Sequence, residues 1–252
     1  MSLLVADAVT KRFSGLTALD QVSLAVDPGE IVGLIGPNGA GKTTLFNCLY
    51  GVLTPDQGRV TFDGHDLSRL PVHRRARLGM GRTFQRIELF VGMTVRDHLL
   101  VAERARRGDG GLLKDLLNRA GPSEDERARV AATLELVGLE EVADRPIESL
   151  GLGRGRLVEL GRSLMIEPKL LLLDEPSSGL DHRETDEMAE VLDTVRAERG
   201  TAILLVEHDV AMVRKVTSRL YVLDFGHLIA EGATTDVIAD AAVRHAYLGD
   251  TV

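Results

Sequence analysis

The stretch GPNGAGKTT, residues 36–44, follows the pattern G-x-x-x-x-G-K-[ST] in full. Glycine has no Cβ, so the backbone N–H groups of such a loop can close around phosphate oxygens. A lysine at position 42 adds positive charge beside the β- and γ-phosphates, and the Thr43 hydroxyl is a ligand for Mg²⁺. The residues predicted to bind a nucleoside triphosphate are Gly36, Pro37, Asn38, Gly39, Ala40, Gly41, Lys42, Thr43 and Thr44.

Two adjacent carboxylates follow four apolar residues in the stretch LLLLDEP, residues 170–176. The carboxyl end of a strand is where an open α/β sheet binds its ligands. Asp174 is suited to hold Mg²⁺, and Glu175 is suited to polarise an attacking water. His208 follows a second apolar run at the same edge, so we interpret it as a γ-phosphate contact rather than a surface histidine. The guanine-reading pattern of GTPases is absent, which favours ATP.

Strands and helices must hold these residues, and apolar runs predict where they lie. Strands are expected over 3–9, 22–26, 31–35, 59–62, 170–173, 202–206 and 220–223, and helices over 43–50, 184–198 and from Asp209. Runs of four or five apolar residues between helices are typical of strands buried on both faces. The second half of the chain therefore predicts a parallel sheet.

The middle of the chain, residues 88–165, has helical spacing instead. A helix is expected after Thr94, and Ser123 with Glu126 forms a capping box that begins another, which Gly138 ends. We therefore expect one domain over 1–252. Its core is formed by 1–87 and 166–252, and 88–165 is an inserted helical subdomain.

Composition excludes several classes of protein. With 44% hydrophobic and 27% charged residues in 252, the chain is that of an ordinary globular protein, and its apolar runs are too short to span a bilayer. The start of the chain lacks the features of a signal peptide, and a single cysteine, Cys48, excludes an internal disulfide. The net charge of −8 argues against a nucleic-acid partner.

Two basic stretches, 73–82 and 103–108, are interpreted as solvated faces, with contact to an acidic partner or a membrane as the alternative.

Taken in order, these motifs resemble the ATP-binding cassette (ABC) family over essentially the whole chain. Walker A is 36–44, the Q-loop is TFQ with Gln85, Walker B is LLLLDE, the D-loop is SSGLD with Asp181, and the switch is His208. The resemblance implies a P-loop NTPase core with a mainly parallel sheet, an N-terminal antiparallel β-subdomain and an inserted helical subdomain. It also implies ATP and Mg²⁺ as cofactors, with Gln85 sensing both γ-phosphate and metal.

By the same resemblance, Phe13 is the aromatic residue that stacks on adenine, with core packing as the alternative. The family signature, typically Leu-Ser-Gly-Gly-Gln, is replaced here by Leu150, Gly151, Leu152, Gly153 and Arg154. In this family two cassettes dimerise head to tail, and each ATP lies between one Walker A and the other signature. Because Gly151 lacks the serine hydroxyl, we expect a signature weaker by about 1.5–3 kcal/mol. Such an asymmetry suits a heterodimer of related cassettes, and a homodimer is the alternative.

Three stretches resemble the subgroup that energises import of branched-chain amino acids: FSGLTALDQVSL, TFQRIELFVGMTVRDHLLVA and AYLGD. The extended segment around RRGDGGLLKDLL resembles the longer of that subgroup's two cassettes. The alternatives are urea or amide import, lipopolysaccharide export, a soluble cassette ATPase and a metabolic P-loop kinase. The implied partners are a second cassette, a transmembrane permease and, indirectly, an extracytoplasmic substrate-binding protein. The implied location is peripheral, on the cytoplasmic face of the membrane. Ile87, Leu89 and Phe90 are candidates for permease docking, with packing in the helical subdomain as the alternative.

Overall fold

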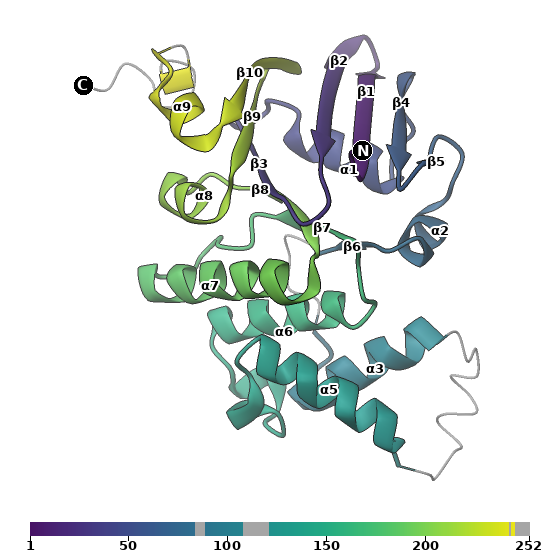
Figure 1. Cartoon of the computed structure of the whole chain (residues 1–252), viewed down its shortest axis with the longest axis vertical. Coiled ribbons are helices and arrows are strands. Elements are labelled where there is room, and N and C mark those ends of the chain that lie inside the picture. The colour runs from purple at the N-terminus through teal and green to yellow at the C-terminus, as the bar shows by residue number, and fades with distance from the viewer. Residues whose placement is uncertain (84–88, 108–120, 242, 245–252) are drawn as a thin grey trace.

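The computed structural model describes residues 1–83, 89–107, 121–241, 243 and 244. One of its two sheets is antiparallel throughout and has the strand order β2-β1-β4-β5. Its strands are β1 (Leu4–Phe13), β2 (Leu16–Val26), β4 (Gln57–Phe62) and β5 (His65–Asp66). This sheet is the N-terminal β-subdomain that the family resemblance implied, and it stands beside the second sheet in Figure 1.

The second sheet has the order β10-β9-β3-β8-β7-β6 and is parallel except for the β9–β10 hairpin. Its strands are β3 (Ile31–Ile35), β6 (Met80–Arg82), β7 (Leu170–Asp174), β8 (Ala202–Val206), β9 (Arg219–Asp224) and β10 (His227–Ala233). Every residue of β3, β7 and β8 is buried. The prediction of a parallel sheet from unbroken apolar runs is thus confirmed.

Helices cover the second sheet and extend below it in Figure 1, where α3, α5 and α6 pack together. The helices are α1 (Lys42–Tyr50), α2 (Val72–Arg77), α3 (Val95–Arg107), α5 (Glu124–Leu136), α6 (Leu152–Leu164), α7 (His182–Arg199), α8 (Val210–Val216) and α9 (Thr234–Ala239), with short 3-10 turns at Glu140–Val142 and Ile147–Ser149. In the part of the chain described, no helix combines the length and apolar character needed to cross a bilayer.

Local signals placed several helix ends correctly. The capping box is present, because the Glu126 N–H donates to Ser123 Oγ at 3.1 Å and the Ser123 N–H donates to Glu126 Oε2 at 2.7 Å. The elements that periodicity missed are short or lie at an edge. β6 has three residues, and β10 alternates between exposed and half-buried positions with no apolar run.

The interpretation of 73–82 as a solvated face is wrong for Arg75 and Arg82. Arg75 is 3% exposed, and its guanidinium donates to the carbonyl oxygens of Cys48 and Leu49 at the end of α1 and of Leu67 and Leu70. A cation at this position complements the partial negative charge of a helix C-terminus. The Arg75 side chain therefore links α1 to the segment that follows β5 rather than facing solvent.

The second basic stretch surrounds a buried carboxylate. Glu103 is 0% exposed, and its Oε1 lies 2.8 Å from Arg107 Nε, 3.0 Å from Arg106 Nη2 and 3.1 Å from Arg129 Nε. Burial on its own would raise the pKa of Glu103, but hydrogen bonds from Arg106 and Arg107 and the charge of Arg129 outweigh it and hold the pKa at about 2. Since Arg129 belongs to α5, this cluster joins α3 to α5.

We expect Glu103→Gln to lower the free energy of unfolding by about 3 kcal/mol at pH 7, because the substitution removes the buried anion of this cluster. The folded-state pKa lies below the ordinary value of 4.5, so the ionised carboxylate stabilises the fold fully above pH 4.5. That contribution is lost as the pH falls through about 2. Urea unfolding should therefore show a smaller difference between wild type and variant at pH 3 than at pH 7.

Asp144→Asn is the matched control, because Asp144 forms a surface ion pair with Arg96 and its side chain is well exposed. Its loss of stability should be much smaller than that of Glu103→Gln. Equal losses in the two variants, or a difference that does not shrink in acid, would contradict the role given to Glu103.

Candidate functional site

The predicted phosphate loop lies between β3 and α1, where two close approaches require glycine. A Cβ on Gly36 would lie 2.0 Å from the Leu223 carbonyl oxygen, and one on Gly41 would lie 2.6 Å from the Ala18 carbonyl oxygen. Both residues also have positive φ, 154° at Gly36 and 106° at Gly41. The loop is therefore held between β2 and β9 by contacts that leave no room for a side chain.

Lys42 is the first residue of α1, and its side chain folds back across the loop. Its Nζ donates to the carbonyl oxygens of Gly36 at 2.6 Å and Pro37 at 3.0 Å. Burial lowers the pKa of Lys42, and the nearby charges of Glu175 and Asp174 act in the opposite direction. The ammonium group thus lies at the phosphate loop with two carboxylates close by.

A hollow of about 600 Å³ opens over this loop. Its lining consists of Phe13, Leu16, Thr17, Ala18, Asn38, Gly39, Ala40, Gly41, Lys42, Thr43, Thr44, Glu175 and Phe225. The lining combines apolar side chains (Phe13, Leu16 and Phe225) with the loop, the lysine and a carboxylate, a combination that fits a base joined to a string of phosphates. The residues present therefore fit a nucleoside triphosphate.

Phe13 ends β1 at the rim of this hollow and is 41% exposed, so the alternative of core packing is wrong. The sequence analysis missed Phe225, which is 82% exposed and has a φ of 42° in the β9–β10 turn. The neighbouring Gly226 N–H donates to the Ala40 carbonyl oxygen at 2.9 Å, which fixes this turn against the phosphate loop. The Asp-Phe-Gly stretch at 224–226 indicates a turn, but only the fold brings it to the hollow.

Asp174 ends β7 as a buried carboxylate beside a buried cation. Its Oδ2 lies 3.4 Å from Arg82 Nη2, and Arg82 Nη1 donates to Asn47 Oδ1 at 2.7 Å. Burial raises the pKa of Asp174, the charge of Arg82 opposes that shift, and Glu175 adds to it. The sequence analysis missed Arg82, which comes from the neighbouring strand β6 with Arg82 in register with Leu172.

Glu175 and His208 follow two adjacent parallel strands. The ladder pairs Asp174 of β7 with Val206 of β8, and the Glu175 N–H donates to the Val206 carbonyl oxygen at 2.9 Å. Glu175 has a φ of 50°, which is uncommon outside glycine and bends the chain sharply at the strand end. Its side chain lines the hollow. His208 has an exposed side chain and stands two residues beyond β8, so the predicted proximity of the two strand ends is confirmed.

The stretch expected to be the signature, 150–154, lies at the start of α6, in the helical part of the molecule, away from α1 in Figure 1. Gly151 is the N-cap and is exposed, whereas Gly153 is buried against α7, where a Cβ would lie 2.7 Å from the Glu184 carboxylate. Asp181 caps α7, since its Oδ1 accepts from the Glu184 N–H at 2.8 Å. Among the described residues that line the hollow, none belongs to 150–154 and none is Asp181.

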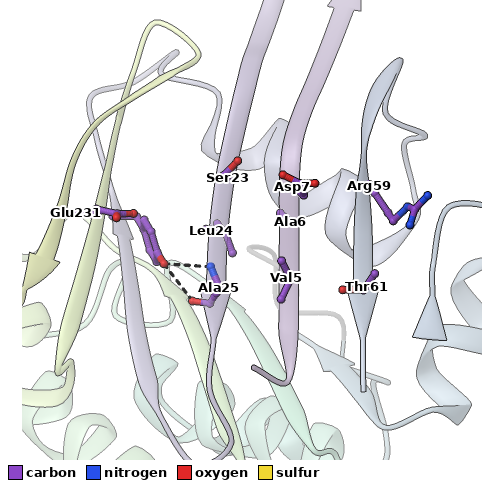
Figure 2. A pocket seen from close by; sticks show the side chains of 10 residues that line it. Val5, Ala6, Asp7, Ser23, Leu24, Ala25, Arg59, Thr61 and Glu231 are labelled. Atoms are coloured by element: carbon purple, nitrogen blue, oxygen red, sulfur yellow. Dashed lines mark hydrogen bonds between the residues drawn. The ribbon is translucent and has the colours of Figure 1, made fainter. Parts of the chain in front are cut away.

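Three of the sequence predictions fall on residues that the structure does not describe: Gln85 of the Q-loop, Ile87 and the stretch AYLGD at 246–250. A second hollow, of about 400 Å³, lies on the outer face of the antiparallel sheet next to β10 (Figure 2). There the Ala25 N–H donates to Tyr221 Oη at 3.0 Å, among side chains that include Asp7, Arg59 and Glu231. This second hollow contains none of the residues that the sequence predicts for catalysis.

Comparison with known proteins gives matches along the whole chain. The profile of the family described as ABC transporter matches residues 19–178. The high-affinity branched-chain amino acid transport ATP-binding protein LivG of Salmonella typhimurium is 42% identical over 251 residues, 98% of each chain. The lipopolysaccharide export system ATP-binding protein LptB of Escherichia coli is 36% identical over 250 residues, 99% of this chain and 98% of LptB. The crystal structure of the ADP conformation of MJ1267, an ATP-binding cassette of an ABC transporter, is 33% identical, covers 99% of this chain and 100% of its own, and superposes with a TM-score of 0.84.

We expect Lys42→Ala to weaken the binding of ATP by at least tenfold, because it removes a buried cation from the phosphate loop. Equilibrium titration with a fluorescent ATP analogue measures this loss. Lys215→Ala serves as the control, because Lys215 forms a surface ion pair with Asp186 on α7. This variant should bind the analogue as tightly as wild type does. Equal affinities of Lys42→Ala and wild type would contradict the assignment of the loop.

Proposed function

This chain belongs to the ABC transporter family and is an ATPase of that family, and we propose that it powers the import of branched-chain or related hydrophobic amino acids through a membrane permease. The similarity to LivG, 42% identity along 98% of both chains, is the observation that carries this choice of substrate class. The chemistry of hydrolysis rests on the hollow that holds the phosphate loop, Lys42 and Glu175 together.

In the proposed mechanism each residue acts on one part of the nucleotide. Phe13 stacks on the adenine, the backbone N–H groups of the loop and Lys42 bind the phosphates, and His208 contacts the γ-phosphate. The Glu175 carboxylate accepts a proton from the attacking water. Thr43 and Asp174 would supply the oxygen ligands that Mg²⁺ prefers, with Gln85 as a further ligand implied by the family. When bound, Mg²⁺ would neutralise charge on the phosphate oxygens.

A second cassette is part of this proposal. The signature of this chain lies away from its own phosphate loop, so only another molecule can bring a signature to the ATP held here. Gly151 lacks the hydroxyl of the usual serine, and the exposed Arg154 replaces the usual glutamine. We infer that this chain hydrolyses ATP at its own Walker site and offers its partner a weaker signature, as suits a heterodimer.

The permease is expected to dock at a groove of about 320 Å³ between α1, α3 and α6. Phe90 lines this groove and is 52% exposed, and the Arg162 guanidinium lies 5.4 Å from the centre of its ring. Leu89, in contrast, is partly buried and packs against the core of the helical subdomain. Docking at this groove implies a peripheral location on the cytoplasmic face of the membrane, with the extracytoplasmic substrate-binding protein reached only through the permease and no nucleic acid involved.

Lipopolysaccharide export is the second candidate, because LptB is 36% identical along nearly the whole chain. In either system the transported compound passes through the permease and does not contact the cassette. Transport itself, rather than a binding experiment on this chain, must therefore decide between the two.

We expect cells lacking this chain to lose ATP-dependent uptake of radiolabelled leucine, isoleucine and valine. Wild type and the surface variant Asp144→Asn should restore uptake. Glu175→Gln should not, because it keeps ATP binding but removes the general base. Unchanged amino-acid uptake together with a defect in lipopolysaccharide export would overturn the proposal in favour of the second candidate.

We expect the double substitution Gly151→Ser with Arg154→Gln to raise the ATPase rate of the assembled pair of cassettes roughly tenfold, because one hydrogen bond to a charged phosphate is regained. The serine fits, since a Cβ on Gly151 meets no atom within 4 Å and serine is favoured at an N-cap. Arg154→Gln alone separates the contributions of the two positions. An unchanged rate in the double variant would refute the weaker-signature hypothesis.

A further inference from the structure

Glu207 is a buried carboxylate between the end of β8 and His208, outside every motif considered above. Its side chain is 0% exposed. The Ser177 N–H donates to its Oε1 at 2.8 Å, and the His208 N–H donates to its Oε2 at 3.0 Å. The Asp209 N–H also points to Oε2, at 3.4 Å. One side chain therefore accepts from main-chain donors of two separate loops.

A buried carboxylate is unfavourable unless its charge is compensated. Within the described part of the chain, no arginine or lysine forms an ion pair with Glu207. The main-chain amides take that role, and hydrogen bonds to an ionised acceptor are about twice as strong as neutral ones. The charge of Glu207 is thus matched to amides of the loops that follow β7 and β8.

These two loops carry the groups expected to act on ATP. The main-chain ladder between β7 and β8 ends where the Glu175 N–H reaches the Val206 carbonyl oxygen. Beyond that point the Glu207 side chain links the two loops, because it accepts a hydrogen bond from the N–H of Ser177, two residues after Glu175. Glu175 has a left-handed φ of 50°, a conformation that persists only where the surrounding structure holds it.

We propose that Glu207 is a positioning residue for ATP hydrolysis. Its carboxylate fixes the main chain of the loops that follow β7 and β8, so that Glu175 and His208 meet the same phosphate group. Glu207 acts through the main chain rather than through the imidazole, because its Oε2 lies 3.8 Å from His208 Nδ1, beyond hydrogen-bond distance. Misplacing a catalytic group by about 1 Å is enough to slow a reaction a hundredfold.

Glu207→Gln tests this role, because glutamine has the same size but replaces one acceptor oxygen with a donor NH₂ group. We expect kcat for ATP hydrolysis to fall at least tenfold, while the Kd for ATP stays within threefold of wild type. We also expect the amides of 175, 177–180 and 207–209 to exchange hydrogen about tenfold faster in the absence of nucleotide. Exchange within β3, β7 and β8 should not change.

Glu103→Gln is the matched control, since it is the same substitution at an equally buried glutamate in the helical subdomain. It should lower stability yet leave kcat unchanged at a temperature where the variant is folded. If Glu207→Gln does not fold, Glu207→Asp keeps the charge and shortens its reach, and it should show the same loss of kcat without loss of affinity.

Two results would overturn the inference. One is a kcat within twofold of wild type in a folded Glu207 variant. The other is a parallel loss of ATP affinity and kcat with faster exchange throughout the sheet, which would show that Glu207 only maintains the fold. Hydrogen exchange is measured without nucleotide, so a failure of the wild-type chain to hydrolyse ATP would count against the ATPase assignment and not against the anchoring of the two loops.

Discussion

Parallel pairing of β3, β8 and β7 brings their carboxyl ends to one edge of the sheet, and the site depends on this register. Leu34 of β3 pairs with Val206 of β8, and Val206 pairs in turn with Asp174 of β7. The loop at 36–44, the carboxylates of Asp174 and Glu175, and His208 therefore all follow strand ends at the same level of the sheet. Because all three strands are buried on both faces, a slip of register would move whole sets of apolar side chains and is strongly opposed.

Buried charges surround this edge, and each has a specific partner. Lys42 donates to two loop carbonyl oxygens, Arg82 bridges Asn47 and Asp174, and Glu207 accepts from the amides of Ser177 and His208. Such groups stabilise a fold only weakly when compared with apolar residues of similar size. In the proposed mechanism these groups act by their fixed positions, because charges and dipoles that need no rearrangement stabilise developing charge on a phosphoryl group.

Much of this site was predictable from sequence because its chemistry lies in short motifs. Gly36, Lys42, Asp174 and Glu175 were identified by spacing alone, and the unbroken apolar runs predicted the strands that hold them. Residues that act through long-range contacts were not predictable. Arg82 reaches Asn47 and Asp174 across 35 and 92 positions, and Glu207 reaches Ser177 across 30. No local pattern distinguishes such side chains from surface charges, which is why the basic stretch 73–82 was misinterpreted.

Gly151 and Gly153, in the stretch proposed as the signature, have different surroundings, and this difference bears on the asymmetry proposed for the assembly. Gly153 is buried against Glu184 of α7, and a side chain at 153 would displace the Glu184 carboxylate. Gly151 has open space around it and an extended backbone, with φ −71° and ψ 171°, that any residue adopts. A neighbouring side chain therefore limits what position 153 can hold, whereas no atom limits position 151. In the proposed heterodimer, the missing hydroxyl at 151 therefore changes the surface offered to the partner cassette without altering the packing of this chain.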